Sequence, residues 1–160
     1  MVLFNEAVIL AVPAGRRVNR YLEDAAYSFD EMSALANPSS DLSNVRRISL
    51  NMLAQEEFIT IDRISDLYPR IQGMFKEYDI SPRIIMHLQQ MSSCYYMAAN
   101  GFGCAFLRSA TLQTVKKSDQ LLFYFIDSPR SIRSTRLYYK KGGYMTKAMQ
   151  AFLSWIPSHL

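Results

Sequence analysis

The sequence predicts an α/β fold in which strands and helices alternate along one chain of 160 residues. Three observations lead to this prediction. Apolar residues make up 49% of the chain, which is enough for a sizeable core. Short β-branched runs end in proline or glycine turns, and segments with helical periodicity separate successive runs. This alternation favours right-handed crossovers and a sheet covered on both faces.

The sequence of the first third of the chain predicts two strands and two short helical segments. The apolar run Ala7–Val12 reads as a buried strand that Pro13 and Gly15 end. From residue 20 to 36 apolar residues lie near helical spacing among turn-forming residues, so we expect a short helix inside a mobile insertion. Ser49 is expected to cap one or two helical turns before a strand over 58–61.

The middle of the chain predicts two units in which a helix follows a strand. Asp62–Asp66 leads into a helix that Ser65 or Asp66 can cap, with its apolar face formed by Leu67, Ile71, Met74, Phe75 and Tyr78. A strand over 83–88 precedes a helix that Ser92 or Ser93 is expected to cap and Asn100-Gly101 to end. A short strand over 104–107 follows.

The last quarter predicts strands over 121–126 and 135–139 and a terminal helix over about 144–156. The apolar residues of this helix recur at spacings of three and four. They are Met145, Ala148, Met149, Phe152, Leu153 and Ile156. Such a stripe must be buried against another surface, and an exposed stripe recruits partners, so we expect self-association.

The residues give little support for an enzyme or a metal site. His87 and His159 lie far apart in the pattern, and Cys94 and Cys104 are expected to be buried reduced thiols. The glycines of 100–103 lie between a helix and a strand, the reverse of the order in nucleotide-binding loops, and no serine has a nucleophile-elbow context. We therefore predict no catalytic residue, no metal and no cofactor.

A binding site is the remaining possibility. In open α/β sheets ligands collect at the carboxyl ends of strands, where helix N-termini direct amide hydrogens outward. Two such junctions, at 62–66 and 90–93, lie before predicted helices. The candidate effector-binding residues are Asp62, Arg63, Ser65, Ser92, Ser93, Phe106 and Arg108. The alternative is that the serines only cap helices and that Arg63 is solvated.

The net charge and the hydropathy pattern limit the classes of partner that the sequence is compatible with. The net charge of +4 is compatible with an anionic small molecule, but the basic residues are dispersed, so we expect a solvated rim rather than a nucleic-acid surface. The longest apolar runs are about half of the ~20 residues that a membrane-spanning helix needs. The first residues do not match a secretory signal, which predicts a cytoplasmic protein.

Four segments together resemble a known family. The segment 100–107, with the sequence NGFGCAFL, resembles the helix end, glycine turn and strand of the effector-binding domain of LysR-type transcriptional regulators. The segments 49–61, 78–84 and 137–146, the last followed by Ala148 and Phe152, resemble other blocks of that domain in the same order. The resemblance runs from about Leu3 to Ile156.

The resemblance implies a type 2 periplasmic-binding-protein-like fold of two α/β lobes with a small effector between them. It implies one complete lobe plus the returning half of the other: residues 1–13 are the crossover strand of the first lobe, 14–119 the second effector-binding lobe with an insertion over 20–44, and 120–160 the return into the first lobe. The family's winged helix-turn-helix has no counterpart in this sequence, so DNA would be bound only through that absent domain.

The expected partners are therefore a small-molecule effector and further copies of the chain in a homo-oligomer. The alternative function is a solute-binding protein of a transporter, which shares the fold and would need an export signal or a lipid anchor.

Overall fold

The computed structural model describes residues 2–37, 39–140 and 142–156. Its strands are β1 (Val2–Pro13), β2 (Arg47–Ile48), β3 (Glu57–Ile61), β4 (Arg83–Leu88), β5 (Cys104–Arg108), β6 (Leu121–Ile126) and β7 (Ile132–Arg136). Its α-helices are α1 (Phe29–Leu35), α2 (Leu67–Glu77), α3 (Met91–Ala99) and α4 (Lys147–Trp155). Its 3-10 helices are η1 (Arg17–Tyr21), η2 (Glu23–Ala25), η3 (Leu50–Leu53), η4 (Ser109–Gln113) and η5 (Pro129–Ser131).

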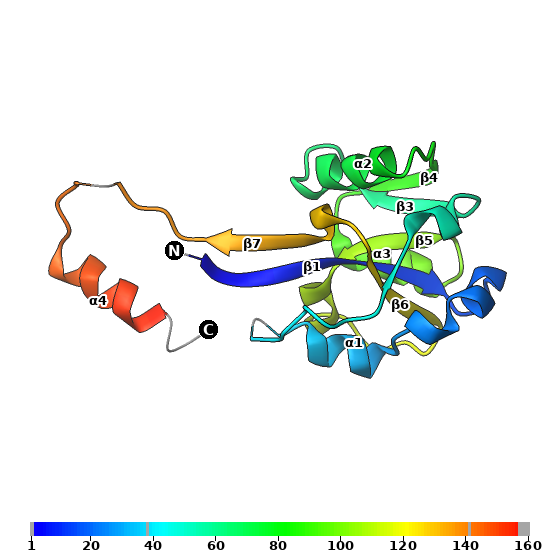
Figure 1. Cartoon of the computed structure of the whole chain (residues 1–160), viewed down its shortest axis with the longest axis horizontal. Coiled ribbons are helices and arrows are strands. Elements are labelled where there is room, and N and C mark those ends of the chain that lie inside the picture. Colours follow the sequence, from blue (N-terminus) through cyan, green and yellow to red (C-terminus); the bar gives the residue numbers. More distant parts are fainter. Residues whose placement is uncertain (1, 38, 141, 157–160) are drawn as a thin grey trace.

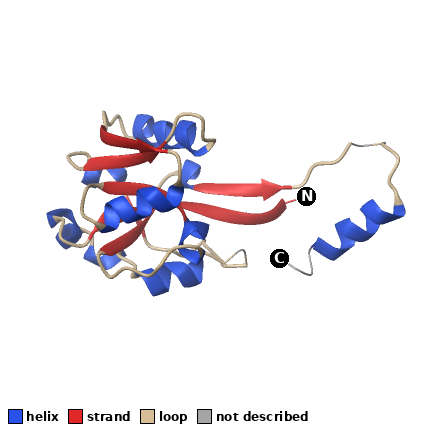
Figure 2. Cartoon of the chain, turned by 180° about the vertical axis from the view of Figure 1, so that it is seen from behind, coloured by secondary structure: helices blue, strands red, loops and turns tan. Residues whose placement is uncertain are grey.

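The strands form one mixed sheet in the order β2-β6-β1-β5-β3-β4, and β7 pairs with β1 outside this path. Strand β1 runs antiparallel to β5, β6 and β7, whereas β3 is parallel to β4 and β5. Figure 1 shows a compact body from which β1 and β7 extend as a two-stranded ribbon, with α4 beyond it. Figure 2 shows helices around the strands of the body and none along the ribbon. The predicted α/β alternation is confirmed.

The core centres on the half of β1 that lies in the body. Residues 7–12 are buried, and Leu10 pairs with Phe106 of β5 on one side and Tyr124 of β6 on the other. Helix α3 packs against β5 and β3, α1 packs against β6, and α2 packs against β3. Because both faces of the sheet are covered, its central strands are continuously apolar rather than alternating.

The segment over 20–44 is not the mobile insertion that we expected. Within its described residues, Leu22, Tyr27, Phe29 and Met32 are buried in the common core. The backbone of Tyr27 pairs with Phe123 of β6 through two hydrogen bonds of 2.9 Å. The segment therefore forms part of the body, because its large apolar side chains cover the sheet.

Several expected boundaries are wrong. Helix α3 begins at Met91 after Gln90, so neither Ser92 nor Ser93 caps it. Strand β7 covers 132–136 rather than 135–139, because its partner is the first half of β1. The terminal helix α4 begins at Lys147 rather than near residue 144, since the Thr146 side chain caps the Met149 amide. The expected helix end at Asn100-Gly101 is confirmed, with Gly101 at a φ of 85°.

The chain does not leave the sheet of the body at residue 120. Strand β6 pairs with β1 from Ile9 to Pro13 and with β2, so it belongs to the sheet of the body. The chain leaves that sheet only after β6, through η5 and β7. The pairing partner of β6, which the sequence does not reveal, decides this boundary.

The expectations for the cysteines are confirmed. Cys94 and Cys104 are buried free thiols, and burial raises their pKa to about 11 and about 12, respectively. His87 Nδ1 lies 3.0 Å from Thr60 Oγ1, and His159 lies outside the described residues. No helix within the described ranges is long and apolar enough to cross a membrane.

The apolar stripe predicted for α4 is exposed at Met149 and Phe152, whereas Ile156 is buried. Met149, Phe152 and Trp155 are 44%, 55% and 53% exposed, although they lie on one side of the helix. Figure 1 shows α4 separated from the body by an extended segment after β7. The helix therefore carries apolar surface that the described part of the chain leaves exposed.

Replacing Met32 tests whether the segment over 20–44 belongs to the core. Met32 is 0% exposed, so Met32→Ala should lower the free energy of unfolding by about 2–5 kcal/mol, measured by urea denaturation. Met52 is 47% exposed, so the matched control Met52→Ala should change the free energy of unfolding by about 0.5 kcal/mol or less. Equal effects of the two substitutions would contradict this packing.

Candidate functional site

The two predicted strand-to-helix junctions lie next to each other. Strands β3 and β4 are parallel neighbours, and the Asp62 amide after β3 donates to the Leu88 carbonyl at the end of β4 over 2.8 Å. Between the junctions is an open pocket of about 310 Å³ lined by Ile61, Asp62, Ile64, Ser65 and Gln89. It brings together two predicted site residues, Asp62 and Ser65. Arg63 follows at its rim with an exposed side chain.

The start of α2 does not offer the unpaired amides that we expected. The Leu67 amide donates to Ser65 Oγ over 3.3 Å and the Tyr68 amide donates to the Ser65 carbonyl over 3.1 Å. Pro69 has no amide hydrogen. Ser65 therefore satisfies the first turn of α2 from within the chain, and an anion at this end would need other donors.

The first turn of helix α3 differs from that of α2. Its first intrahelical hydrogen bond joins the Cys94 amide to the Gln90 carbonyl over 3.2 Å, so the amides of Ser92 and Ser93 precede the helical ladder. Both serines are half buried, and neither is among the residues that line the pocket between the junctions.

Phe106 is not available to a ligand. Its side chain is 0% exposed, and its ring packs against Phe58 and Phe75 with centroid separations of 5.6 Å and 5.3 Å. The expectation that Phe106 lies at the site is wrong, because the ring points into the core under α2 rather than toward the strand end.

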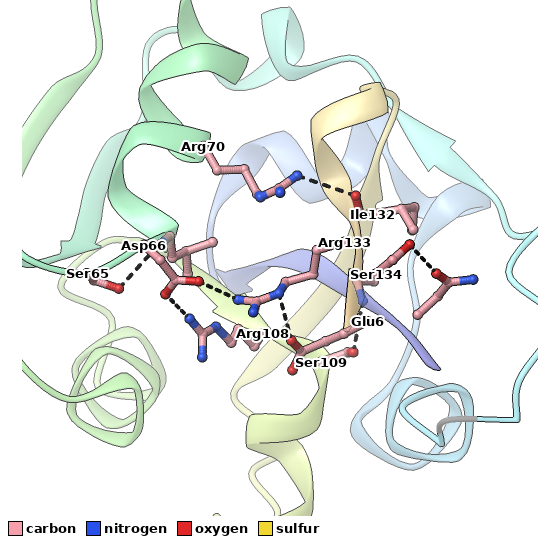
Figure 3. A network of polar contacts seen from close by, with 12 residues as sticks. Glu6, Ser65, Asp66, Arg70, Arg108, Ser109, Ile132, Arg133 and Ser134 are labelled. Atoms are coloured by element: carbon pink, nitrogen blue, oxygen red, sulfur yellow. Dashed lines mark hydrogen bonds and ion pairs between the residues drawn. The ribbon is translucent and has the colours of Figure 1, made fainter. Parts of the chain in front are cut away.

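Arg108, the last residue of β5, belongs to a charged cluster that the sequence did not reveal (Figure 3). The Asp66 carboxylate binds two guanidinium groups. Its Oδ1 accepts from Arg108 Nη2, and its Oδ2 accepts from Arg133 Nη1 over 2.8 Å. Arg133 Nε lies 3.5 Å from Glu6 Oε2. Four separate elements therefore meet here: the start of α2, the end of β5, and the two strands of the ribbon.

Burial differs strongly within this cluster. The Glu6 side chain is 11% exposed, and its pKa is raised because burial disfavours the charged form, although Arg133 and Arg108 partly oppose this effect. Arg108 Nε is buried and has no hydrogen-bond partner among the described residues. The cluster is thus a partly desolvated charge network in which the arginines retain unused donor capacity.

Helix α2 is also attached to η5 and to the start of β7. Arg70 Nη1 donates to the Arg130 carbonyl over 2.7 Å and reaches the Ile132 carbonyl at 3.4 Å. Farther along the helix, Arg130 Nε donates to Glu77 Oε1 over 2.6 Å. The position of α2 is therefore coupled to the start of β7 along most of its length.

A second pocket lies on the other side of Glu6. It has a volume of about 230 Å³ and a predominantly apolar lining, with Phe4 and Glu6 from the ribbon, Leu35 and Leu42 from the segment over 20–44, and Ala110 after β5. Glu6 thus contacts the charged cluster through its carboxylate and also lines an apolar pocket.

Sequence reasoning missed Glu6, Asp66 and Arg133 as members of the site. The expected solvated rim is wrong for Arg133, and also for Arg16, which lies 3.5 Å from Glu56 and donates to the Gly101 carbonyl. One signal in the sequence could have pointed to Glu6. This carboxylate directly precedes the buried apolar run of β1, and a carboxylate in such a place usually requires a charged or hydrogen-bonding partner. The register between β1 and β7 that supplies this partner is not visible in the sequence.

Comparison with known proteins identifies similar domains. The family model described as LysR substrate binding domain matches residues 27–160. A search of curated proteins finds no match. The effector binding domain of QuiR in complex with shikimate has a TM-score of 0.67 and 17% identity, covering 99% of this chain and 63% of that chain.

Two further solved structures are also similar. The regulatory domain of Synechocystis PCC6803 CcmR in complex with 2-PG has a TM-score of 0.67 and 17% identity, covering 99% of this chain and 64% of that chain. Full-length BenM has a TM-score of 0.63 and 15% identity, covering 99% of this chain and 45% of that chain. At these identities the likeness shows the fold.

The raised pKa of Glu6 predicts a pH-dependent stability. A folded-state pKa above the ordinary value of 4.5 means that Glu6 stabilises the fold while protonated, and this contribution is lost as pH rises through the folded pKa. Between about pH 4 and pH 7, the wild type should therefore lose stability relative to Glu6→Gln, measured by urea denaturation. Glu23→Gln on η2 controls for the loss of an exposed carboxylate. Parallel pH profiles of wild type and Glu6→Gln would contradict the prediction.

Proposed function

Because this chain belongs to the LysR substrate binding domain family, we propose that it senses a small effector for a LysR-type transcriptional regulator. The family has the type 2 periplasmic-binding-protein-like fold and is not an enzyme family, and membership does not favour the alternative of a transporter's solute-binding protein. The chain spans about 63% of the QuiR domain structure. DNA binding is therefore assigned to a separate domain of such a regulator.

In this proposal the body of the structure is the second lobe, and the ribbon of β1 and β7 is the connection to the first. The effector binds at the face where the ribbon leaves the body, because the ends of β3 and β5 and the start of α2 meet there. A change in lobe closure on binding would then alter the packing between subunits.

One observation carries the assignment of an effector site: two guanidinium groups, from Arg108 and Arg133, meet at one point, and Glu6, which pairs with Arg133, also lines an apolar pocket. Forked guanidinium donors match the geometry of a carboxylate or a phosphate. The adjacent pocket of about 230 Å³ suits the apolar part of a small metabolite. The effector class that this arrangement supports is a small organic anion.

In this proposal most of the residues predicted from the sequence belong to the same effector site. Asp62, Arg63 and Ser65 lie on the junction that leads into α2, and Arg108 lies within the cluster itself. Ser92 and Ser93, at the start of α3, remain candidates for direct hydrogen bonds to an effector. We place Asp66 and Arg133 among the effector-site residues as well.

We also propose that the chain forms a homo-oligomer in the cytoplasm. The support is the exposed stripe of Met149, Phe152 and Trp155 on α4, since contiguous apolar surface favours association.

Arg133→Ala tests the effector site. In thermal-shift measurements on the purified chain with small carboxylates and phosphate esters, an effector should raise the Tm of the wild type. A hundredfold excess over Kd corresponds to about 2.7 kcal/mol of stabilisation. The response should be lost in Arg133→Ala. It should persist in Arg136→Ala, which removes the same charge from an exposed position of the same strand. An unchanged response in Arg133→Ala would refute the placement.

A further inference from the structure

We infer that Asp66 is a built-in competitor for the anionic group of the effector: its carboxylate occupies Arg108 and Arg133 and must leave them when an anion binds. The inference rests on the proposed function, because it takes the two arginines as the anion site. It adds the regulation of that site by a residue of the chain itself.

The contacts of Asp66 reproduce those expected from a bound carboxylate. One carboxylate oxygen accepts from Arg108 and the other from Arg133, so a single carboxylate bridges two guanidinium groups that come from different strands. A ligand carboxylate or a sulfate ion could make the same two contacts. It competes with Asp66 for these contacts, because the Nη groups of Arg108 and Arg133 that face the ligand already donate to the Asp66 carboxylate.

The exposed fractions of the three side chains indicate which of them can move away from the others. The Asp66 side chain is 63% exposed, whereas the side chains of Arg108 and Arg133 are 32% and 23% exposed. Asp66 therefore lies on the solvent side of the two arginines. Ion pairs with such an exposed member are weak, so a ligand that adds apolar contacts can replace it.

Arg133, in contrast, has a second partner besides Asp66. Its Nε lies 3.5 Å from the Glu6 carboxylate on the adjacent strand. The Arg108 Nε is buried without a partner among the residues that the structure describes, and the Nη2 of the same guanidinium pairs with Asp66. Removal of Asp66 would therefore leave Arg133 paired with Glu6 and release Nη groups of both arginines for an anion.

The exchange would also change how α2 is attached to the ribbon. Asp66 is the N-cap residue of α2, and Arg133 lies on β7, so their ion pair ties the start of the helix to the ribbon. An anion that replaces Asp66 breaks this tie while the contacts of Arg70 and Glu77 farther along α2 persist. Effector binding would thereby loosen one end of a helix that is otherwise fixed to the connection between the lobes.

The test compares Asp66→Asn with the wild type by isothermal titration calorimetry at low chloride, using inorganic sulfate and benzoate as probes. The substitution keeps the shape of the side chain and removes its charge. We expect Asp66→Asn to bind at least one of the two anions about tenfold or more tightly than the wild type, a gain equivalent to about 1.4 kcal/mol. Arg133→Ala in the Asp66→Asn background should abolish the gain.

Asp79→Asn is the matched control, because Asp79 lies just past the other end of α2 and asparagine tolerates its positive φ of 51°. This variant should bind both anions as the wild type does. If Asp66→Asn does not fold, Asp66→Ser, which retains a residue suited to an N-cap, serves in its place.

The outcomes separate this inference from the proposed function. Equal anion affinity in Asp66→Asn, Asp79→Asn and the wild type would overturn the role of Asp66. The effector site would still stand if Arg133→Ala abolished the thermal response of the wild type. If neither the wild type nor a folded Asp66→Asn bound an anion, and no effector raised the Tm, both proposals would fail.

Discussion

The antiparallel pairing of β1 constrains the rest of the structure. Its buried half lies between β5 and β6, and its other half pairs with β7. Leu10, with neighbours on both sides in the sheet, could not be exposed without opening both ladders. Because one strand serves the body and the ribbon, the place where it passes from one to the other is fixed, and the charged cluster forms around Glu6 at that place.

The candidate site depends on this junction for its chemistry as well as for its position. A carboxylate on β1 is mostly buried there, and Arg133, its register neighbour on β7, offsets part of the cost of that burial. Arg133 then also reaches Asp66, which in turn binds Arg108. The side chains of the proposed anion site are therefore also structural contacts, so an anion bound there would affect the attachment of α2.

Much of the fold could be predicted from local pattern. The periodicity around α2, the glycine end of α3 and the apolar runs of β1 and β6 have physical causes within a few neighbouring residues, and the structure agrees with them. The exact start of α3 and the position of β7 could not be predicted from local sequence pattern. The first depends on the extended backbone of Gln90, which is followed directly by the helix, and the second depends on which residues of β1 are free to pair.

The sequence by itself determined the α/β class, the buried thiols, the resemblance to the LysR effector-binding domain and the two strand-to-helix junctions, at 62–66 and 90–93. These features follow from composition and short-range spacing. Only the tertiary structure decided that Phe106 belongs to the core and that Asp66 bridges Arg108 and Arg133. The reason is physical: the two Asp66 contacts join residues 42 and 67 positions apart in the chain, and only the tertiary fold brings these residues together.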